Sequence, residues 1–237
     1  MALPLNLAMT QSEIAAADQF PSRLAWMSCQ FSPFTKGITN IPKSLPEGAM
    51  LILDDQQNCF THSPDLVARQ LLDAVQQLGC ESVLLDFQRP ADPESITMAR
   101  TIVEALPCPV AVTEEFAKDL LTCPVLLAPC PLHMPLQTYL QPWQGRELWM
   151  EAALCQEIIT VRRNGTSFTP DYPVDLTGGF FEPNLLCRYR IAVSPEKITF
   201  TLFDTPETLH RKLLEAHALG VRRFVGLFQE LGTSLNM

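Results

Sequence analysis

Short apolar runs recur along the chain, and most of them are followed by polar or helical stretches. Seven runs indicate buried strands: 23–29, 49–54, 82–87, 109–113, 124–128, 147–154 and 223–228. Runs of four to eight apolar residues between turn residues are typical of strands in the interior of a sheet. The pattern therefore predicts a sheet whose strands alternate with helices.

Three segments carry apolar residues at helical spacing. In 65–78 they occupy positions 66, 67, 71, 72, 75 and 78, and Gly79 lies just past the end. Segments 95–106 and 206–219 repeat this spacing; Thr205 caps the start of the last segment and Gly220 ends it. A helix followed by a buried strand is the repeating unit of the TIM (β/α) barrel, and 237 residues match one such barrel.

One region breaks this rhythm. Between 155 and 204 the residues alternate in polarity, Asn164-Gly165 gives a strong hairpin signal, and 194–197 form a second turn. We predict an antiparallel β insertion between the last two barrel strands. The first 48 residues hold one convincing strand, which leaves open an irregular or incomplete barrel near the N-terminus. The whole chain, 1–237, is expected to form a single barrel domain.

Composition narrows the classes of partner. The net charge of −9 disfavours nucleic acid and anionic membrane surfaces as partners. No apolar stretch is long enough for a membrane span, and no basic residue precedes Arg23 to begin an export signal, so we expect a cytoplasmic protein. The eight cysteines show no CxxC pair and are interpreted as free thiols. We predict neither a metal site nor a cofactor.

The segment from Ser82 to Pro90 carries the most informative chemistry. A buried strand ends near Asp86, and Gln88 follows two residues later, so strand alternation places both on one face and Phe87 on the other. Active sites of α/β barrels lie at the carboxyl ends of the strands. Asp86 is therefore a candidate site residue, whereas the amide of Gln88 has no proton to donate as an acid.

Further carboxylates end or interrupt the predicted strands. Glu151 lies in an otherwise apolar run, where burial raises a pKa toward the range of a proton donor; a nearby arginine partner is the structural alternative. Asp54 or Asp55 ends its strand as Asp86 does. Glu114 follows another strand and is a candidate for the barrel mouth, and Glu115 is either a second candidate or the start of a helix.

Two groups of motifs resemble a known family, the family 18 glycoside hydrolases, which include chitinases, spore-cortex hydrolases and chitinase-like lectins. The segment Phe203-Asp204-Thr205-Pro206-Glu207, a helix to Gly220 and the run 225–232 are similar to the last third of that family. The runs 51–55 and 85–88 are similar to its third strand and its Asp-x-Asp-x-Glu fourth strand. The resemblance implies a TIM barrel with a sugar site at its carboxyl-terminal mouth.

The chain departs from this family at the chemically important positions. Gln88 occupies the position of the family's proton donor, so general acid catalysis is lost there. Gln229 replaces the tryptophan that floors the family's sugar site in the last strand. Asp86 and Glu230 are what remains of the family's polar set. The resemblance and the pattern together give Asp86 and Glu151 as candidate catalytic residues and Asp54, Gln88, Glu114, Gln229 and Glu230 as candidate ligand-binding residues.

Three functions are compatible with these residues. The first is a glycoside-hydrolase-like pseudoenzyme that binds an oligosaccharide or another small ligand without the family's acid catalysis. The second is an active hydrolase with a rearranged pair, Asp86 with Glu151 or Glu114, whose carboxylates stand about 5 to 10 Å apart. The third is a non-catalytic interaction or scaffold protein, which a filled barrel mouth and an exposed apolar patch would indicate.

Overall fold

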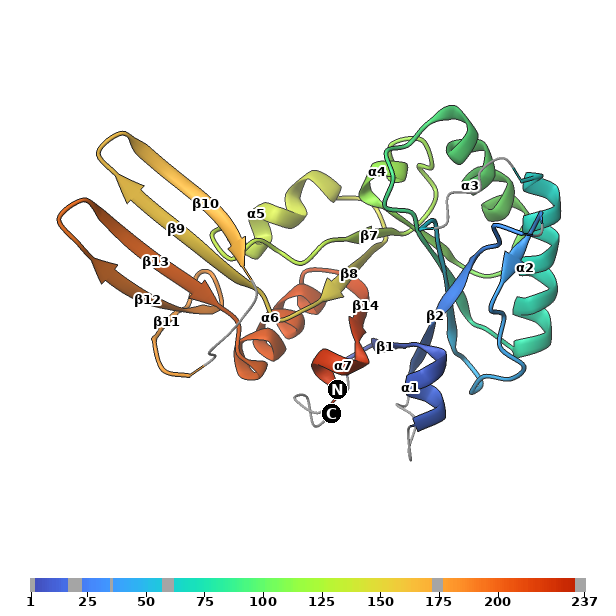
Figure 1. The fold of residues 1–237 in the computed structure, drawn as a ribbon, viewed down its shortest axis with the longest axis horizontal. Coiled ribbons are helices and arrows are strands. Elements are labelled where there is room, and N and C mark those ends of the chain that lie inside the picture. The colour runs from blue at the N-terminus through green and yellow to red at the C-terminus, as the bar shows by residue number, and fades with distance from the viewer. Residues whose placement is uncertain (1–2, 17–22, 35, 57–61, 172–176, 233–237) are drawn as a thin grey trace.

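A computed structural model describes residues 3–16, 23–34, 36–56, 62–171 and 177–232. It shows a closed barrel of eight parallel strands with a second, antiparallel sheet projecting from it (Figure 1). In chain order the barrel strands are β1 (Leu5–Met9), β2 (Leu24–Phe31), β4 (Met50–Asp54), β5 (Ser82–Asp86), β6 (Val110–Thr113), β7 (Val125–Leu127), β8 (Leu148–Ala152) and β14 (Val221–Leu227). The predicted TIM-barrel fold is confirmed.

Strand β1 closes the barrel, and it is the strand that the sequence pattern missed. On one side it pairs in parallel with β14, from Leu5 opposite Phe224 onward, and on the other side with β2, from Leu7 opposite Leu24 onward. The expectation of an incomplete barrel is therefore wrong. The strand escaped detection because the polar Asn6 at its second position interrupts the apolar run.

The barrel is closed but irregular near its N-terminus, because the connection between β2 and β4 contains a short strand where a helix would be expected. The helices are α1 (Gln11–Ala16), α2 (Pro64–Leu78), α3 (Pro93–Ala105), α4 (Glu114–Ala117), α5 (Leu136–Leu140), the 3₁₀ helix η1 (Gln141–Trp143), α6 (Pro206–Ala218) and α7 (Phe228–Leu231). Between β2 and β4 the described residues form no helix but the two-residue strand β3 (Ile38–Thr39), antiparallel to β2. No helix in the described part of the chain is long and apolar enough to cross a membrane.

Helix α2 ends at the predicted Gly79 and α6 begins after the predicted cap Thr205, whereas α3 begins at Pro93, two residues before the predicted segment 95–106. Thr205 accepts a hydrogen bond at its Oγ1 from the backbone N–H of Thr208 (3.2 Å), which caps the start of α6. Gly79 ends α2 with φ of 65°, a left-handed conformation that glycine adopts without steric cost. Helices α2 and α3 pack side by side over one flank of the barrel (Figure 1).

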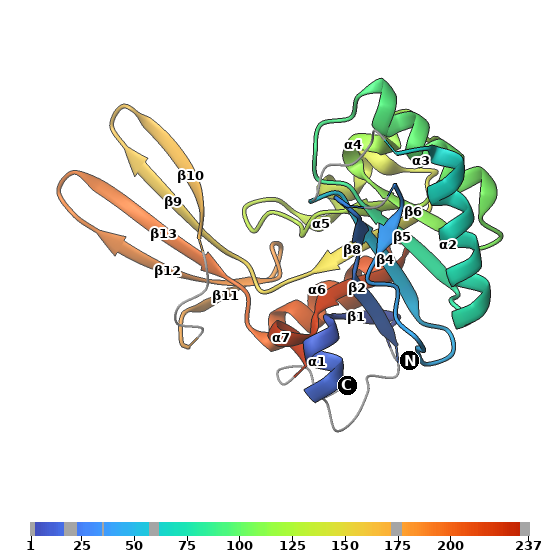
Figure 2. The ribbon, with the colours of Figure 1, turned by 45° about the vertical axis from the view of Figure 1, so that its right-hand side comes forward.

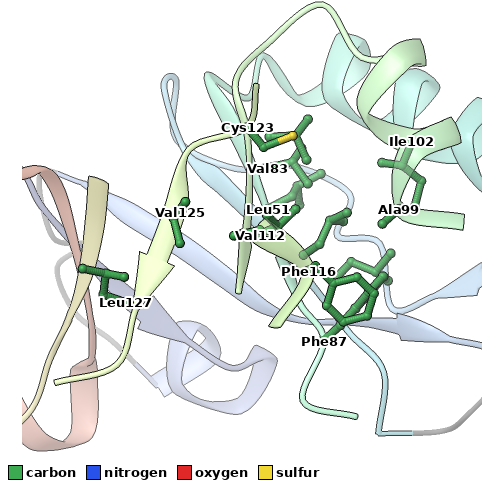
Figure 3. Close-up of a cluster of buried hydrophobic side chains, with 14 of the residues drawn as sticks. Leu51, Val83, Phe87, Ala99, Ile102, Val112, Phe116, Cys123, Val125 and Leu127 are labelled. Atoms are coloured by element: carbon green, nitrogen blue, oxygen red, sulfur yellow. The ribbon is translucent and has the colours of Figure 1, made fainter. Parts of the chain in front are cut away.

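Two apolar clusters hold the barrel together. The larger one lies between the strands and the helices, where Leu51, Val83 and Phe116 meet the α3 residues Ala99 and Ile102 (Figure 3). The smaller one plugs the barrel interior and consists of Ala8, Ala25, Met50, Ile52, Leu84, Ala111, Leu126, Trp149 and Val225. Each of the eight barrel strands contributes at least one apolar residue to this plug.

The predicted insertion is present between β8 and α6. Its strands β9 (Gln156–Arg162), β10 (Gly165–Asp171), β11 (Phe180–Glu182), β12 (Cys187–Val193) and β13 (Lys197–Phe203) form one antiparallel sheet in the order β10-β9-β13-β12-β11. The sheet extends away from the barrel in both views (Figure 2). Both predicted hairpins are found, although Gly165 already pairs with Arg162, so the first turn is formed by Arg163 and Asn164.

A buried ion pair fixes the return from the insertion to the barrel. Lys212 Nζ of α6 lies 2.9 Å from both carboxylate oxygens of Asp204, and the two side chains are 5% and 1% exposed. The Thr208 hydroxyl donates a third hydrogen bond to Asp204 Oδ1 at 3.2 Å. Removing one partner of such a pair leaves the other charge buried without compensation.

We predict that Lys212→Met lowers the free energy of unfolding by about 3–5 kcal/mol, because the Asp204 carboxylate loses its counter-charge. Urea unfolding measures this loss. Arg211→Met on the same helix is the control, because Arg211 pairs with Glu207 at the exposed surface, where ion pairs contribute about 0–1 kcal/mol. Equal losses in the two variants would contradict the assignment of Lys212 as a structural charge.

Candidate functional site

Strand alternation places carboxylates directly above the apolar plug. Side chains two residues apart on a strand point to the same side. Each of three inward plug residues is followed two positions later by an acid: Ile52 by Asp54, Leu84 by Asp86, and Trp149 by Glu151. The chain thereby replaces a hydrophobic layer by a ring of carboxylates at the carboxyl ends of β4, β5 and β8.

This ring lines a cavity of about 500 Å³ at the mouth of the barrel. Its charged lining residues are Asp54, Asp86, Glu151 and Glu230, and the plug residues Ile52, Leu84, Leu126 and Val225 contribute to its floor. The volume lies within the range of small-molecule sites, about 300–1,000 Å³. The structure therefore brings four of the candidate site residues together in one cavity.

Asp54 and Asp86 occupy equivalent positions on neighbouring strands. They are paired in the register of β4 and β5, and Gln30 of β2 stands opposite Asp54 on the other side. Asp54 Oδ1 accepts the backbone N–H of Gln56 at 3.1 Å. Burial is the main cause that raises the pKa of Asp54, and the charge of Asp86 adds to it. Both side chains have therefore lost part of the solvation that a carboxylate prefers.

Gln88 contacts Asp86 but does not line the cavity. Its side-chain amide donates a hydrogen bond to Asp86 Oδ1, and the Gln88 side chain is otherwise exposed. Burial raises the pKa of Asp86, and this hydrogen bond from Gln88 opposes the rise. The amide thus stabilises the anionic form of Asp86.

Asp55 fixes the turn that carries Gln88. Its side chain is 1% exposed, and its two oxygens accept the backbone N–H groups of Gln88 (3.0 Å) and Arg89 (3.1 Å). Of the two consecutive aspartates, Asp54 faces the cavity and Asp55 positions the neighbouring loop. The alternative that the sequence left open between them is thereby decided by their contacts.

Glu151 has the most perturbed acid–base behaviour in the cavity. Burial is the main cause that raises its pKa to about 7, and the charges of Asp86 and Glu114 add to it. Within the described residues, no ion pair joins Glu151 to an arginine or lysine. A carboxyl group in this state holds its proton near neutral pH, which is the requirement for a general acid.

Glu114 contributes to the raised pKa of Glu151, but its own carboxylate is engaged in hydrogen bonds within the protein. Its Oε1 accepts the backbone N–H of Ala128 at 3.1 Å and lies 3.2 Å from the hydroxyl of Tyr139, which is 2.9 Å from the Ala128 carbonyl. Glu114 does not line the cavity. Glu115 occupies the first turn of α4 and forms an exposed pair with Lys118.

Of the two candidates from the last segment, Glu230 lines the cavity and Gln229 does not. Helix α7 carries Glu230 to the cavity, and Glu230 Oε1 accepts the backbone N–H of Leu154. Gln229 is exposed on the same helix and does not line the cavity. Placing Gln229 in the last strand is wrong, because β14 ends at Leu227 and the chain turns into α7 at Phe228.

The sequence pattern missed most of the uncharged polar lining. Thr10, Gln11, Ser28, Gln30, Asn40 and Gln56 all face the cavity. Thr10 and Gln11 follow the missed strand β1, and Ser28 and Gln30 lie on β2, which extends two residues beyond the predicted run 23–29. The alternation of Ser28 and Gln30 with the more buried Cys29 and Phe31 is the signal that would have extended that strand. No group of three or more His, Cys, Asp or Glu in the described residues has a metal-binding arrangement.

Comparisons with known proteins agree on the architecture. No family model matches the chain, and no curated protein matches it in sequence. The spore cortex-lytic enzyme SleL of Bacillus megaterium is similar in structure with a TM-score of 0.58 and 9% identity, over 94% of this chain and 69% of SleL. A class V chitinase from Nicotiana tobaccum, a glutamate-to-glutamine mutant in complex with NAG4, gives 0.57 and 11%, over 93% and 92%. A Chromobacterium violaceum chitinase gives 0.53 and 9%, over 99% and 96%.

Identities this low show the fold alone. The chain has the barrel fold of chitinases and of spore cortex-lytic enzymes, so the resemblance seen in its sequence motifs is confirmed at the level of structure.

The raised pKa of Glu151 predicts a pH-dependent stability. Between about pH 4.5 and about pH 7 the folded state keeps the Glu151 proton and the unfolded state does not. The folded state therefore binds more protons, and the free energy of unfolding falls as pH rises through this window, by at most about 3 kcal/mol. Urea unfolding from pH 4.5 to 8 measures the fall.

The variant Glu151→Gln should lack this component, because its amide does not titrate. The exposed Glu115→Gln is the control and should keep the wild-type slope. Identical slopes for wild type and Glu151→Gln would show that Glu151 is ionised across the window.

Proposed function

We propose that the cavity at the barrel mouth binds a saccharide. One observation carries this proposal: four carboxylates from separate elements, Asp54, Asp86, Glu151 and Glu230, converge on one cavity at the carboxyl ends of the strands. Carboxylate oxygens are strong hydrogen-bond acceptors for the hydroxyl groups of a sugar. The mouth of a TIM barrel is also where binding sites of this fold are built.

The structural relatives support this assignment. The tobacco chitinase holds NAG4 although one of its glutamates has been changed to glutamine. A barrel of this fold therefore accommodates an oligosaccharide with an amide in place of an acid. This agrees with an interpretation of Gln88 as a residue that accompanies binding without supplying a proton.

Isothermal titration with NAG4 and other short saccharides tests binding. We expect at least one of them to bind, and Asp86→Ala to weaken its affinity at least tenfold, because Asp86 lines the cavity. The control is Asp73→Ala on the exposed face of α2, which removes an equal charge far from the mouth. Failure of every saccharide to bind, or binding that survives Asp86→Ala, would overturn the proposal.

A second candidate function is hydrolysis by Glu151 and Asp86. The observation that favours it is the pKa of Glu151, about 7, next to the charge of Asp86 on the same cavity. Glu151 in its protonated form suits the general acid, and Asp86, which accepts a hydrogen bond from the Gln88 amide, suits the stabilising or nucleophilic carboxylate. Glu114 is the weaker partner because Ala128 and Tyr139 engage its Oε1.

If the protein hydrolyses saccharides, Glu151→Gln should lower kcat by about 10²–10⁴-fold, the usual contribution of general acid catalysis. The rate should also fall above about pH 7, as Glu151 loses its proton. Release of reducing ends from NAG4 or from peptidoglycan fragments measures both effects. Unchanged turnover in Glu151→Gln would exclude this residue, and Gln88→Glu tests separately whether an acid at position 88 creates activity.

The interaction or scaffold function has weaker support. It predicts a filled mouth, whereas the mouth contains a cavity of about 500 Å³. Its other expectation, an exposed apolar patch, agrees with the insertion, where Phe168, Phe180 and Val193 are more than half exposed. The cavity makes a small-ligand site the better-supported function.

A further inference from the structure

The ionisable side chains that line the cavity are all acidic, and among the described residues no lysine, arginine or histidine belongs to the lining. These side chains are Asp54, Asp86, Glu151 and Glu230, of which Glu151, with a pKa of about 7, is partly protonated near neutral pH. All 17 lysines and arginines and all four histidines of the chain lie among the described residues, and none of them lines the cavity. Arg89 Nη2 donates a hydrogen bond to the carbonyl of the lining residue Gln56 (3.3 Å), but Arg89 does not itself line the cavity.

The carboxylates are held by neutral donors. Asp54 accepts a backbone N–H, Asp86 accepts the Gln88 amide, and Glu230 accepts the backbone N–H of Leu154. These bonds orient the oxygens, and among the described residues no ion pair joins Asp54 or Asp86 to a lysine or an arginine. Burial and mutual repulsion accordingly raise the pKa values of Asp54, Asp86 and Glu151.

The apolar part of the lining offers no flat surface to a neutral sugar ring. Among the described residues, its apolar members are aliphatic, with Met27 and Leu227 as the largest at the mouth, and no aromatic side chain is included. Stacking on aromatic faces is a large source of favourable contact area for flat ligands. Affinity in this cavity must therefore come mainly from hydrogen bonds and charge.

A buried amide on β1 neighbours the cavity lining without belonging to it. Asn6 of β1 is fully buried, and neither its Oδ1 nor its Nδ2 has a hydrogen-bond partner in the described part of the chain. The register places Asn6 beside Val225, which in turn pairs with Glu151, and Val225 lines the cavity. In the strand register this row reads Glu151, Val225, Asn6, so the unpartnered amide of Asn6 lies next to a lining residue but is not itself part of the lining.

We propose that the cavity binds a cationic saccharide, an amino sugar or short oligomer with free ammonium groups, in preference to its N-acetylated counterpart. This inference rests on the proposed saccharide site. An ammonium group donates three hydrogen bonds and supplies the missing positive charge, and charge-assisted bonds are roughly twice as strong as neutral ones. Acetylation removes that charge and adds a methyl group, for which the acidic wall has no partner.

A matched pair of ligands tests the inference: the tetramer of glucosamine and NAG4, titrated calorimetrically at pH 7 and at low and high salt. We expect the free amine to bind at least tenfold more tightly and to lose affinity several-fold as salt rises, because the interaction is electrostatic. Asp54→Asn should reduce this preference without loss of folding, since it removes a charge that Asp86 repels. Asp73→Asn changes the net charge equally at a distant surface and should leave the preference intact.

The outcomes separate the two proposals. Equal affinity for the two tetramers, or tighter binding of NAG4, would overturn the cationic preference and leave the saccharide site standing. No binding of either tetramer or of any other saccharide would overturn the proposed function as well. A preference that falls equally in Asp54→Asn and Asp73→Asn would also overturn the inference, because it would trace the effect to the overall charge of the protein.

Discussion

Closure of the barrel by β1 is the constraint on which the site depends. With β1 hydrogen-bonded to both β14 and β2, the sheet has no edge, and the inward side chains of eight strands must share one column of space. The lower part of that column is filled by aliphatic residues and Trp149. Where the plug ends, the same inward positions continue as Asp54, Asp86 and Glu151, and the column opens into a cavity.

The consecutive residues Asp54 and Asp55 have different roles, one in the cavity and one in holding a neighbouring loop. Asp54 faces the cavity and has a raised pKa, whereas the Asp55 carboxylate accepts hydrogen bonds from two backbone N–H groups of the loop after β5. That loop delivers the Gln88 amide to Asp86, which stabilises the Asp86 anion, and the Asp86 charge in turn helps Glu151 to retain its proton. One buried aspartate outside the cavity therefore influences the protonation of an acid on the far wall.

The sequence predicted the barrel because seven of its strands are apolar runs and three segments between them have helical spacing, and it predicted the insertion from alternation and a hairpin dipeptide. It did not predict β1, because a short strand with a buried asparagine has no periodic signal. Asp54, Asp86 and Glu151 could be found because strand alternation extends to them. Gln88, Glu114 and Gln229 lie past the ends of their strands, where turn geometry and α7 decide their direction and alternation no longer applies.

The central claim is that the carboxylates above the barrel plug form a saccharide site. A crystal structure after soaking with short amino-sugar and N-acetylated oligomers tests it most directly. The account predicts density for a sugar ring in the cavity, within hydrogen-bonding distance of Asp86 and Glu151. Saccharide bound only elsewhere, such as on the apolar face of the insertion, with the cavity holding solvent alone, would contradict it.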